Sequence, residues 1–267
     1  MASSIKAPLG GSHSYTVIFL HGRGSLGHEL AEDLFDSKAS DRRTLAEIFP
    51  SVKWVFPTSR LRNSARAAHD FPSIAHHVNP MSQWFDIWSI EDRSEKPELM
   101  LEGLRESIAD LLDVIRKEAK EVPLESIILG GISQGCATAI MTLLASNLRI
   151  GGVIGLCGWL PLQEDIANIQ LPASSARISQ TLRLYLEDAS PIPADLQSYT
   201  AKMTAIFLAH SRDDEMVPFT QGESLKNTME ILGYNVSYAH YNDGGHWIHG
   251  TYGIDDIAAF LKGCFSL

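Results

Sequence analysis

Six short runs of nearly continuous apolar, β-branched or aromatic residues constrain the fold more than any other feature of this sequence. They are YTVIFL at 15–20, VKWVF at 52–56, SIILG at 126–130, GGVIGL at 151–156, AIFLA at 205–209 and NVSYAHY at 235–241. Near-continuous apolarity is typical of strands that are covered on both faces, as in parallel sheets. The runs therefore predict a mostly parallel central sheet.

Helical patterns lie between these runs. Residues 100–120 repeat leucine and isoleucine at spacings of three and four, with charged residues on the opposite face. Shorter helices are expected at 28–37, 136–146, 220–232 and 254–262. Alternating strands and helices predict an α/β fold with helices on both faces of the sheet. The 267 residues, of which 45% are hydrophobic, fit one domain over 1–267.

Two segments interrupt the alternation. Residues 58–95 contain four arginines, three histidines and the aromatic cluster QWFDIW, and residues 161–200 contain four prolines. Insertions in an alternating fold usually lie at the carboxyl ends of strands, where ligands bind. We therefore expect both segments to be loop or cap insertions that form the walls of a substrate pocket. Residues 1–14 are expected to be a flexible N-terminus.

Charge and cysteine content limit the possible binding partners and the possible cellular compartment. A net charge of -10 disfavours nucleic acid and anionic membranes, and favours a small-molecule partner. The three cysteines have no CxxC spacing, which fits a reducing compartment. No signal-peptide pattern and no apolar run of membrane-spanning length is present, so we expect a cytoplasmic protein. The sequence does not specify an oligomeric state.

The segment GISQG at 131–135 has the G-x-S-x-G spacing between an expected strand and an expected helix. In that context the glycines let the chain turn sharply and present the hydroxyl of Ser133 at the start of the helix. The alternative is a serine that only fills a tight turn. The strand and helix on either side favour a nucleophile.

A serine nucleophile needs a base, and the base needs an orienting acid. His246 follows the last expected strand and a flexible glycine pair, and histidine titrates near working pH. His240 and His249 are the alternatives and are interpreted as packing or surface residues. Asp213 and Asp214, just after the strand AIFLA, compete for the orienting role.

An oxyanion hole needs backbone N–H donors. One is expected from Gln134, which follows the nucleophile, and the other from Arg23 in the loop HGRGS at 21–25. The side chain of Arg23 can also contact substrate. For this loop alone, a plain glycine-rich turn is the competing interpretation.

The motifs VIFLHGRGSLGHELAEDL, WFDIWS, GGISQGCA, HSRDDEMVP and GGHW occur in this order. Together they resemble the phospholipase/carboxylesterase family of α/β-hydrolases, which includes the acyl-protein thioesterases, and WFDIWS is most similar to fungal members. The resemblance implies an α/β-hydrolase fold and a triad of Ser133, Asp214 and His246. It also implies oxyanion donors from the backbones of Arg23 and Gln134. The chain differs from the thioesterases in having Arg23 where they usually carry an apolar residue, and its 161–200 segment is longer.

These features predict hydrolysis of a carboxylic ester or thioester through an acyl-enzyme, without a cofactor. The substrate would be a small molecule or an acylated protein. One alternative is a dedicated hydrolase or acyltransferase of a secondary-metabolite pathway. Another is a non-hydrolytic small-molecule-binding protein on the same scaffold.

Pocket residues are harder to predict, because aromatic residues lie in the core as often as they line a pocket. The candidates are Trp84, Phe85, Trp88, Trp159, Leu160 and Val217. Two histidine-rich groups are the candidates for a metal site: His69, Asp70, His76 and His77, or His240, His246 and His249. Neither has the spacing that places two ligands on one helix face, so no metal is expected.

Cys136 is expected to pack against the sheet.

Overall fold

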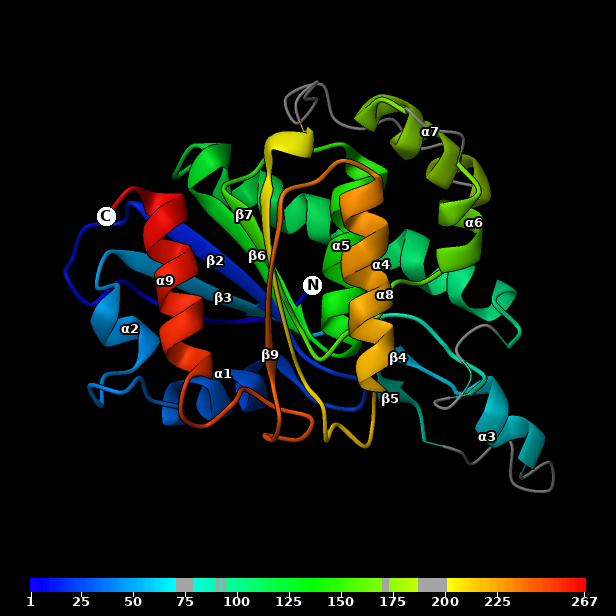
Figure 1. The fold of residues 1–267 in the computed structure, drawn as a ribbon, viewed down its shortest axis with the longest axis horizontal. Coiled ribbons are helices and arrows are strands. Elements are labelled where there is room, and N and C mark those ends of the chain that lie inside the picture. The colour runs from blue at the N-terminus through cyan, green and yellow to red at the C-terminus, as the bar shows by residue number, and fades with distance from the viewer. Residues whose placement is uncertain (71–78, 90–91, 93–94, 170–172, 187–200) are drawn as a thin grey trace.

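The computed structural model describes residues 1–70, 79–89, 92, 95–169, 173–186 and 201–267 (Figure 1). A seven-stranded sheet in the order β1-β3-β2-β6-β7-β8-β9 forms its centre. The strands are β1 Ser3–Lys6, β2 Tyr15–Leu20, β3 Val52–Pro57, β6 Ile127–Ile132, β7 Gly152–Leu156, β8 Ala205–Ser211 and β9 Val236–Tyr241. All neighbours pair in parallel except β1 with β3. The predicted parallel sheet is confirmed, and each of the six apolar runs forms a strand.

Helices cover both faces of the sheet (Figure 1). One face carries α1 Gly27–Asp36, α2 Leu45–Ile48 and α9 Gly253–Phe265. The other carries α4 Glu98–Glu118, α5 Gln134–Ser146, α7 Ser175–Tyr185 and α8 Phe219–Ile231. In β2, Val17 and Phe19 pack into the core of the first face and Ile18 and Leu20 into that of the second. Burial on both sides explains why this strand is apolar at successive positions.

The expectation of a flexible N-terminus is wrong for Ser3–Lys6. These residues form the edge strand β1, in which Ile5 pairs with Val55 of β3. The segment is four residues long and no residue in it is fully buried, so it lacks the apolar run that identifies the other strands.

The two insertions contribute short elements around the sheet. The first contains β4 Leu61–Arg62, α3 Ala65–Asp70 and β5 Met81–Ser82, with β4 and β5 paired antiparallel. The second contains α6 Gln163–Ala167 and α7, and the short turns Leu124–Ser126 and Ala201–Met203 lie outside the insertions. Residues 71–78, 90–91, 93–94, 170–172 and 187–200 lie outside the described residues. Within the described ranges, no helix is both long and apolar enough to cross a bilayer.

The connections reverse direction between β2 and β6. From β2 the chain moves to β3 on one side, whereas from β6 it moves through β7 and β8 to β9 on the other. In open α/β sheets ligands bind outside the carboxyl ends of the strands at such a switch point. The loop after β2 and the G-x-S-x-G turn after β6 meet there.

Candidate active site

Ser133 occupies a strained turn between β6 and α5. Its φ and ψ angles are 56° and -121°, outside the regions that L-residues usually adopt. The flanking glycines are sterically required: a Cβ on Gly135 would lie 2.3 Å from the carbonyl oxygen of Leu20, and one on Gly131 would lie 2.5 Å from the carbonyl carbon of Gly135. This close packing forces the backbone to turn, so that the serine side chain faces away from the sheet.

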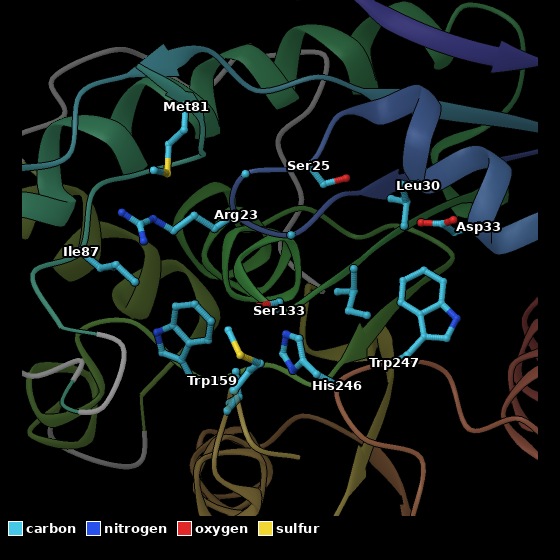
Figure 2. A pocket seen from close by; sticks show the side chains of 15 residues that line it. Arg23, Ser25, Leu30, Asp33, Met81, Ile87, Ser133, Trp159, His246 and Trp247 are labelled. Carbon is cyan, nitrogen blue, oxygen red and sulfur yellow. The ribbon is translucent and has the colours of Figure 1, made fainter. Parts of the chain in front are cut away.

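His246 and Asp214 are brought together from the loops after β9 and β8. Nδ1 of His246 lies 2.8 Å from Oδ2 and 3.0 Å from Oδ1 of Asp214. The carboxylate therefore favours the tautomer with a proton on Nδ1, which leaves Nε2 as an acceptor. The imidazole is 24% exposed whereas the carboxylate is fully buried. Both His246 and Ser133 line one cavity, where Figure 2 shows the ring beside the serine.

Asp214 is held by four donors. Oδ1 accepts the backbone N–H groups of Met216 and Val217 at 2.9 and 2.8 Å. Oδ2 lies 3.2 Å from Nε2 of His210, which also lies 2.9 Å from the carbonyl oxygen of Val217. Burial alone would raise the pKa of Asp214, but the hydrogen bonds from His210, His246 and Val217 outweigh it and hold the pKa below its ordinary value. The carboxylate is therefore ionised at neutral pH.

The competing residues take other positions. Asp213 accepts the N–H of Gly245 at 2.9 Å, so it fixes the loop that carries His246. His249 contacts Asp243 at 3.0 Å, and the exposed His240 lies against the ring of Phe219. His210 did not emerge from the sequence as a site residue. The sequence feature that could have identified His210 is its position four residues before Asp214, at the buried end of a strand.

The loop after β2 lies directly against the serine turn. A Cβ on Gly22 would be 3.5 Å from Cβ of Ser133. The N–H of Gly24 donates to Ser82, whereas the N–H of Arg23 has no acceptor among the described residues. The N–H of Gln134 is the first of α5, and helices provide no internal acceptor for their first N–H groups. Two unused backbone donors therefore lie beside the serine.

The side chain of Gln134 ties this site to the aromatic cluster. Its Oε1 accepts the N–H of Trp84 at 2.9 Å, and its Nε2 donates to the carbonyl of Phe85 at 2.7 Å. Nε1 of Trp84 in turn donates to the carbonyl of His21 at 2.8 Å. These bonds are buried, so they connect the loop after β2 rigidly to the start of α5.

A cavity of about 500 Å³ opens over Ser133 (Figure 2). Its volume is in the range of sites for small molecules. Most of its wall is apolar, with Trp159 and Val217 among the lining residues. The pocket therefore contains a serine on a strained turn and an oriented imidazole, and two backbone N–H groups without an acceptor adjoin the serine. Acyl transfer requires groups of these kinds.

Comparison with known proteins agrees with this chemistry. The family model for phospholipases and carboxylesterases matches residues 3–198. The chain belongs to the phospholipase/carboxylesterase family. Acyl-protein thioesterase 1 of Cryptococcus neoformans is 28% identical over 232 residues, covering 84% of this chain and 77% of that protein. Acyl-protein thioesterase 1 of Yarrowia lipolytica is 26% identical over 262 residues, covering 97% and 94%.

A solved structure shares the fold of this phospholipase/carboxylesterase family member. The crystal structure of Zea mays acyl-protein thioesterase 2 has a TM-score of 0.67 at 23% identity and covers 98% of both chains. The resemblance stated from the motifs is thereby confirmed, and so is the α/β-hydrolase fold. As a member of this family the chain is an ester or thioester hydrolase.

Several expected pocket residues of this hydrolase lie elsewhere. Trp84 and Phe85 are fully buried in the core and do not line the cavity, because Gln134 and α4 hold them inward. Trp88 is half-buried under the ammonium of Lys96, 3.0 Å from its ring centre. Leu160 lines a second cavity of about 360 Å³, which shares Trp159 with the first.

Among the described residues, His240, His246 and His249 do not form a group that could hold a metal ion. His69 pairs with the exposed Asp70, and His76 and His77 lie outside the described residues. One other group, Cys157 with Asp214 and His246, has its ligand atoms within 4.8 Å of one another. A metal there would have to displace the bond between Asp214 and His246. Burial first, and then the nearby Asp214 charge, raise the pKa of Cys157, which disfavours the thiolate that a metal requires. Cys136 is fully buried, as expected.

Proposed function

We propose that the chain is a serine hydrolase in which Ser133, His246 and Asp214 form the catalytic triad. The observation that carries this proposal is the imidazole of His246, which is oriented by the buried carboxylate of Asp214 and opens into the same cavity as Ser133. This is the relation between acid, base and nucleophile that activates a serine hydroxyl.

In the proposed reaction the oxygen of Ser133 attacks the substrate carbonyl carbon, and its proton moves to Nε2 of His246. The carbonyl oxygen becomes an oxyanion that accepts the N–H groups of Arg23 and Gln134. The intermediate then expels the alcohol or thiol, which takes the proton from His246. Water attacks the acyl-enzyme by the same route and releases the acid and the free serine. Asp214 stays ionised throughout and stabilises the imidazolium.

The substrate is proposed to be a small-molecule ester or thioester, or an acylated protein. The apolar cavity wall supports an acyl group, and the fungal relatives named acyl-protein thioesterase support a thioester. The net charge of -10 argues against nucleic acid as a partner. The three cysteines are free, which supports a cytoplasmic location.

Labelling with a fluorophosphonate probe tests the assignment through the intact mass of the protein. The serine oxygen displaces fluoride from the probe, so wild type is expected to gain the mass of one probe less HF. Ser133→Ala and His246→Ala are expected to gain none. Ser25→Ala changes another cavity serine and His240→Ala an exposed histidine, so both controls should label like wild type. Full labelling or full esterase activity of Ser133→Ala would refute the proposal.

A further inference from the structure

The side chain of Arg23 is held in a fixed direction on the wall of the catalytic cavity. Nε donates to Oε1 of Gln83 at 2.8 Å, and Nη2 lies 3.4 Å from Oγ of Ser64. Gln83 is fully buried, and its own amide donates to the carbonyls of Arg62 and Asn63. A buried, neutral side chain therefore orients the guanidinium, which is 21% exposed.

The charge of Arg23 is only partly balanced within the protein. Its nearest acid is Asp86, whose Oδ1 lies 4.0 Å from Nη2. The same carboxylate already accepts the N–H groups of Ala65 and Ile87 at 2.7 and 2.9 Å. Among the described residues Nη1 has no hydrogen-bond partner. Burial lowers the pKa of Arg23 and the Asp86 charge only opposes this, so an additional anion would stabilise the cation.

The cavity is polarised along its length. Figure 2 shows Arg23 with Met81 and Ile87 on one side of Ser133, and Asp33 with Trp247 on the other. Arg23 is the only arginine or lysine among the lining residues that the structure describes, and the remainder are mostly apolar or small. A substrate with one negative group would therefore place that group at the Arg23 side.

We propose that Arg23 determines specificity by binding a carboxylate of the substrate, so that the preferred substrates are esters or thioesters that carry a free carboxylate. Guanidinium and carboxylate groups match in geometry and charge. One cation balances a carboxylate, whereas a phosphate dianion would retain a negative charge in an apolar pocket that also carries Asp33. This inference rests on the proposed serine hydrolase function.

The test uses two pairs of substrates in which a free carboxylate is compared with its neutral methyl ester. In the first pair, the carboxylate is on the acyl part: p-nitrophenyl hemiglutarate against its neutral methyl ester. In the second, it is on the leaving group: 4-acetoxybenzoate against methyl 4-acetoxybenzoate. The readout is the ratio of kcat/KM for the charged and the neutral member. This ratio cancels any effect of a substitution on the oxyanion donor or on loop stability.

In wild type at least one ratio should exceed unity by on the order of 10- to 100-fold, mainly through KM, because the pair forms in the bound ground state. Arg23→Met should abolish this preference, and Arg23→Lys should retain part of it. Arg60→Met is the control, since this exposed arginine pairs with Asp110 outside the cavity, and it should leave the ratios unchanged.

The possible failures are distinguishable. Ratios near unity in both pairs, or a preference that persists in Arg23→Met, would overturn the inference while hydrolysis itself stands. Failure of both carboxylate substrates in an enzyme that reacts with the fluorophosphonate would also overturn it. A folded wild type that cleaves none of the four substrates and takes no probe would instead refute the proposed hydrolase function.

Discussion

Replacing Asp214 by asparagine tests the acid of the proposed triad with little change in shape. An asparagine oxygen in the place of Oδ1 can still accept the two backbone N–H groups of Met216 and Val217. Its NH₂ group then replaces Oδ2 and faces Nδ1 of His246 at 2.8 Å and Nε2 of His210 at 3.2 Å. Two donors would then face each other across the shorter contact. In the tautomer with the proton on Nε2, Nδ1 instead accepts from the new NH₂ group, so we expect this tautomer to predominate over an Nδ1–H bond to the amide oxygen at 3.0 Å. That tautomer cannot accept the proton of Ser133.

The magnitude follows from these contacts. A wrong tautomer of the catalytic base lowers kcat by about 10⁴-fold in serine proteases with this triad, and we expect the same order here. The loss of charge-assisted hydrogen bonds, each contributing about 1.5 to 3 kcal/mol, is partly offset by a new bond to His246. We therefore expect the free energy of unfolding at pH 7 to fall by about 2 kcal/mol.

The pH dependence of stability has a defined sign. The pKa of Asp214 is lowered on folding, so its contribution is fully present above the ordinary aspartate pKa of about 3.9 and is lost as the pH falls towards the folded-state value. Asp214→Asn removes this contribution. The difference in unfolding free energy between pH 7 and pH 3 should therefore be smaller in the variant than in wild type.

Steady-state hydrolysis of p-nitrophenyl acetate and urea unfolding at the two pH values measure these effects. Asp213→Asn is the matched control, because Asp213 contacts the N–H of Gly245 and not the imidazole. It should lower kcat by less than about tenfold, as expected for a loop contact. A folded Asp214→Asn enzyme with kcat within tenfold of wild type would refute the assignment, and a larger loss in Asp213→Asn would transfer the orienting role to Asp213.

Two further substitutions and one chemical treatment test residues that support the site. Gly135→Ala should lower the free energy of unfolding, measured by urea denaturation, by about 3 kcal/mol or more, because the new methyl would lie 2.3 Å from a backbone oxygen. Gly250→Ala is the control and should be neutral, because its methyl would meet nothing within 4 Å. Gln134→Met keeps its backbone N–H but leaves the buried N–H of Trp84 without its acceptor. We therefore expect steady-state kinetics to show a kcat about tenfold lower, and urea denaturation to show a free energy of unfolding about 2 kcal/mol lower. Cys157 should resist iodoacetamide at pH 8 until the protein unfolds, because burial raises its thiol pKa, and peptide mass spectrometry would detect early alkylation.

The strands and the serine turn were predictable because each depends on local sequence. β2 and β6 are apolar at successive positions since both faces are covered, and the turn between β6 and α5 needs glycines that the sequence shows directly. The edge strand β1 was not predictable, since it is short and its pairing with β3 is a long-range contact.

Side-chain roles in the first insertion were less predictable. Trp84 was considered for the pocket because aromatic residues serve both as walls and as core, and composition does not separate the two. The deciding contact is the buried bond to Gln134, which is fifty residues distant in sequence. The same limit applies to His210, whose contact with Asp214 depends on how the chain turns after β8.

The site therefore combines two kinds of positional control. The proposed catalytic residues lie just beyond strand ends, where a parallel sheet brings distant segments to one edge regardless of the loops that follow. The proposed specificity for a carboxylate depends on the insertion at 58–95, because Gln83 orients the guanidinium of Arg23. The backbone N–H of Arg23 belongs to the proposed catalytic group, whereas its side chain belongs to the proposed specificity group. A substitution at Gln83 should therefore alter the preference for charged substrates while the neutral reaction continues, which separates recognition from catalysis at one residue.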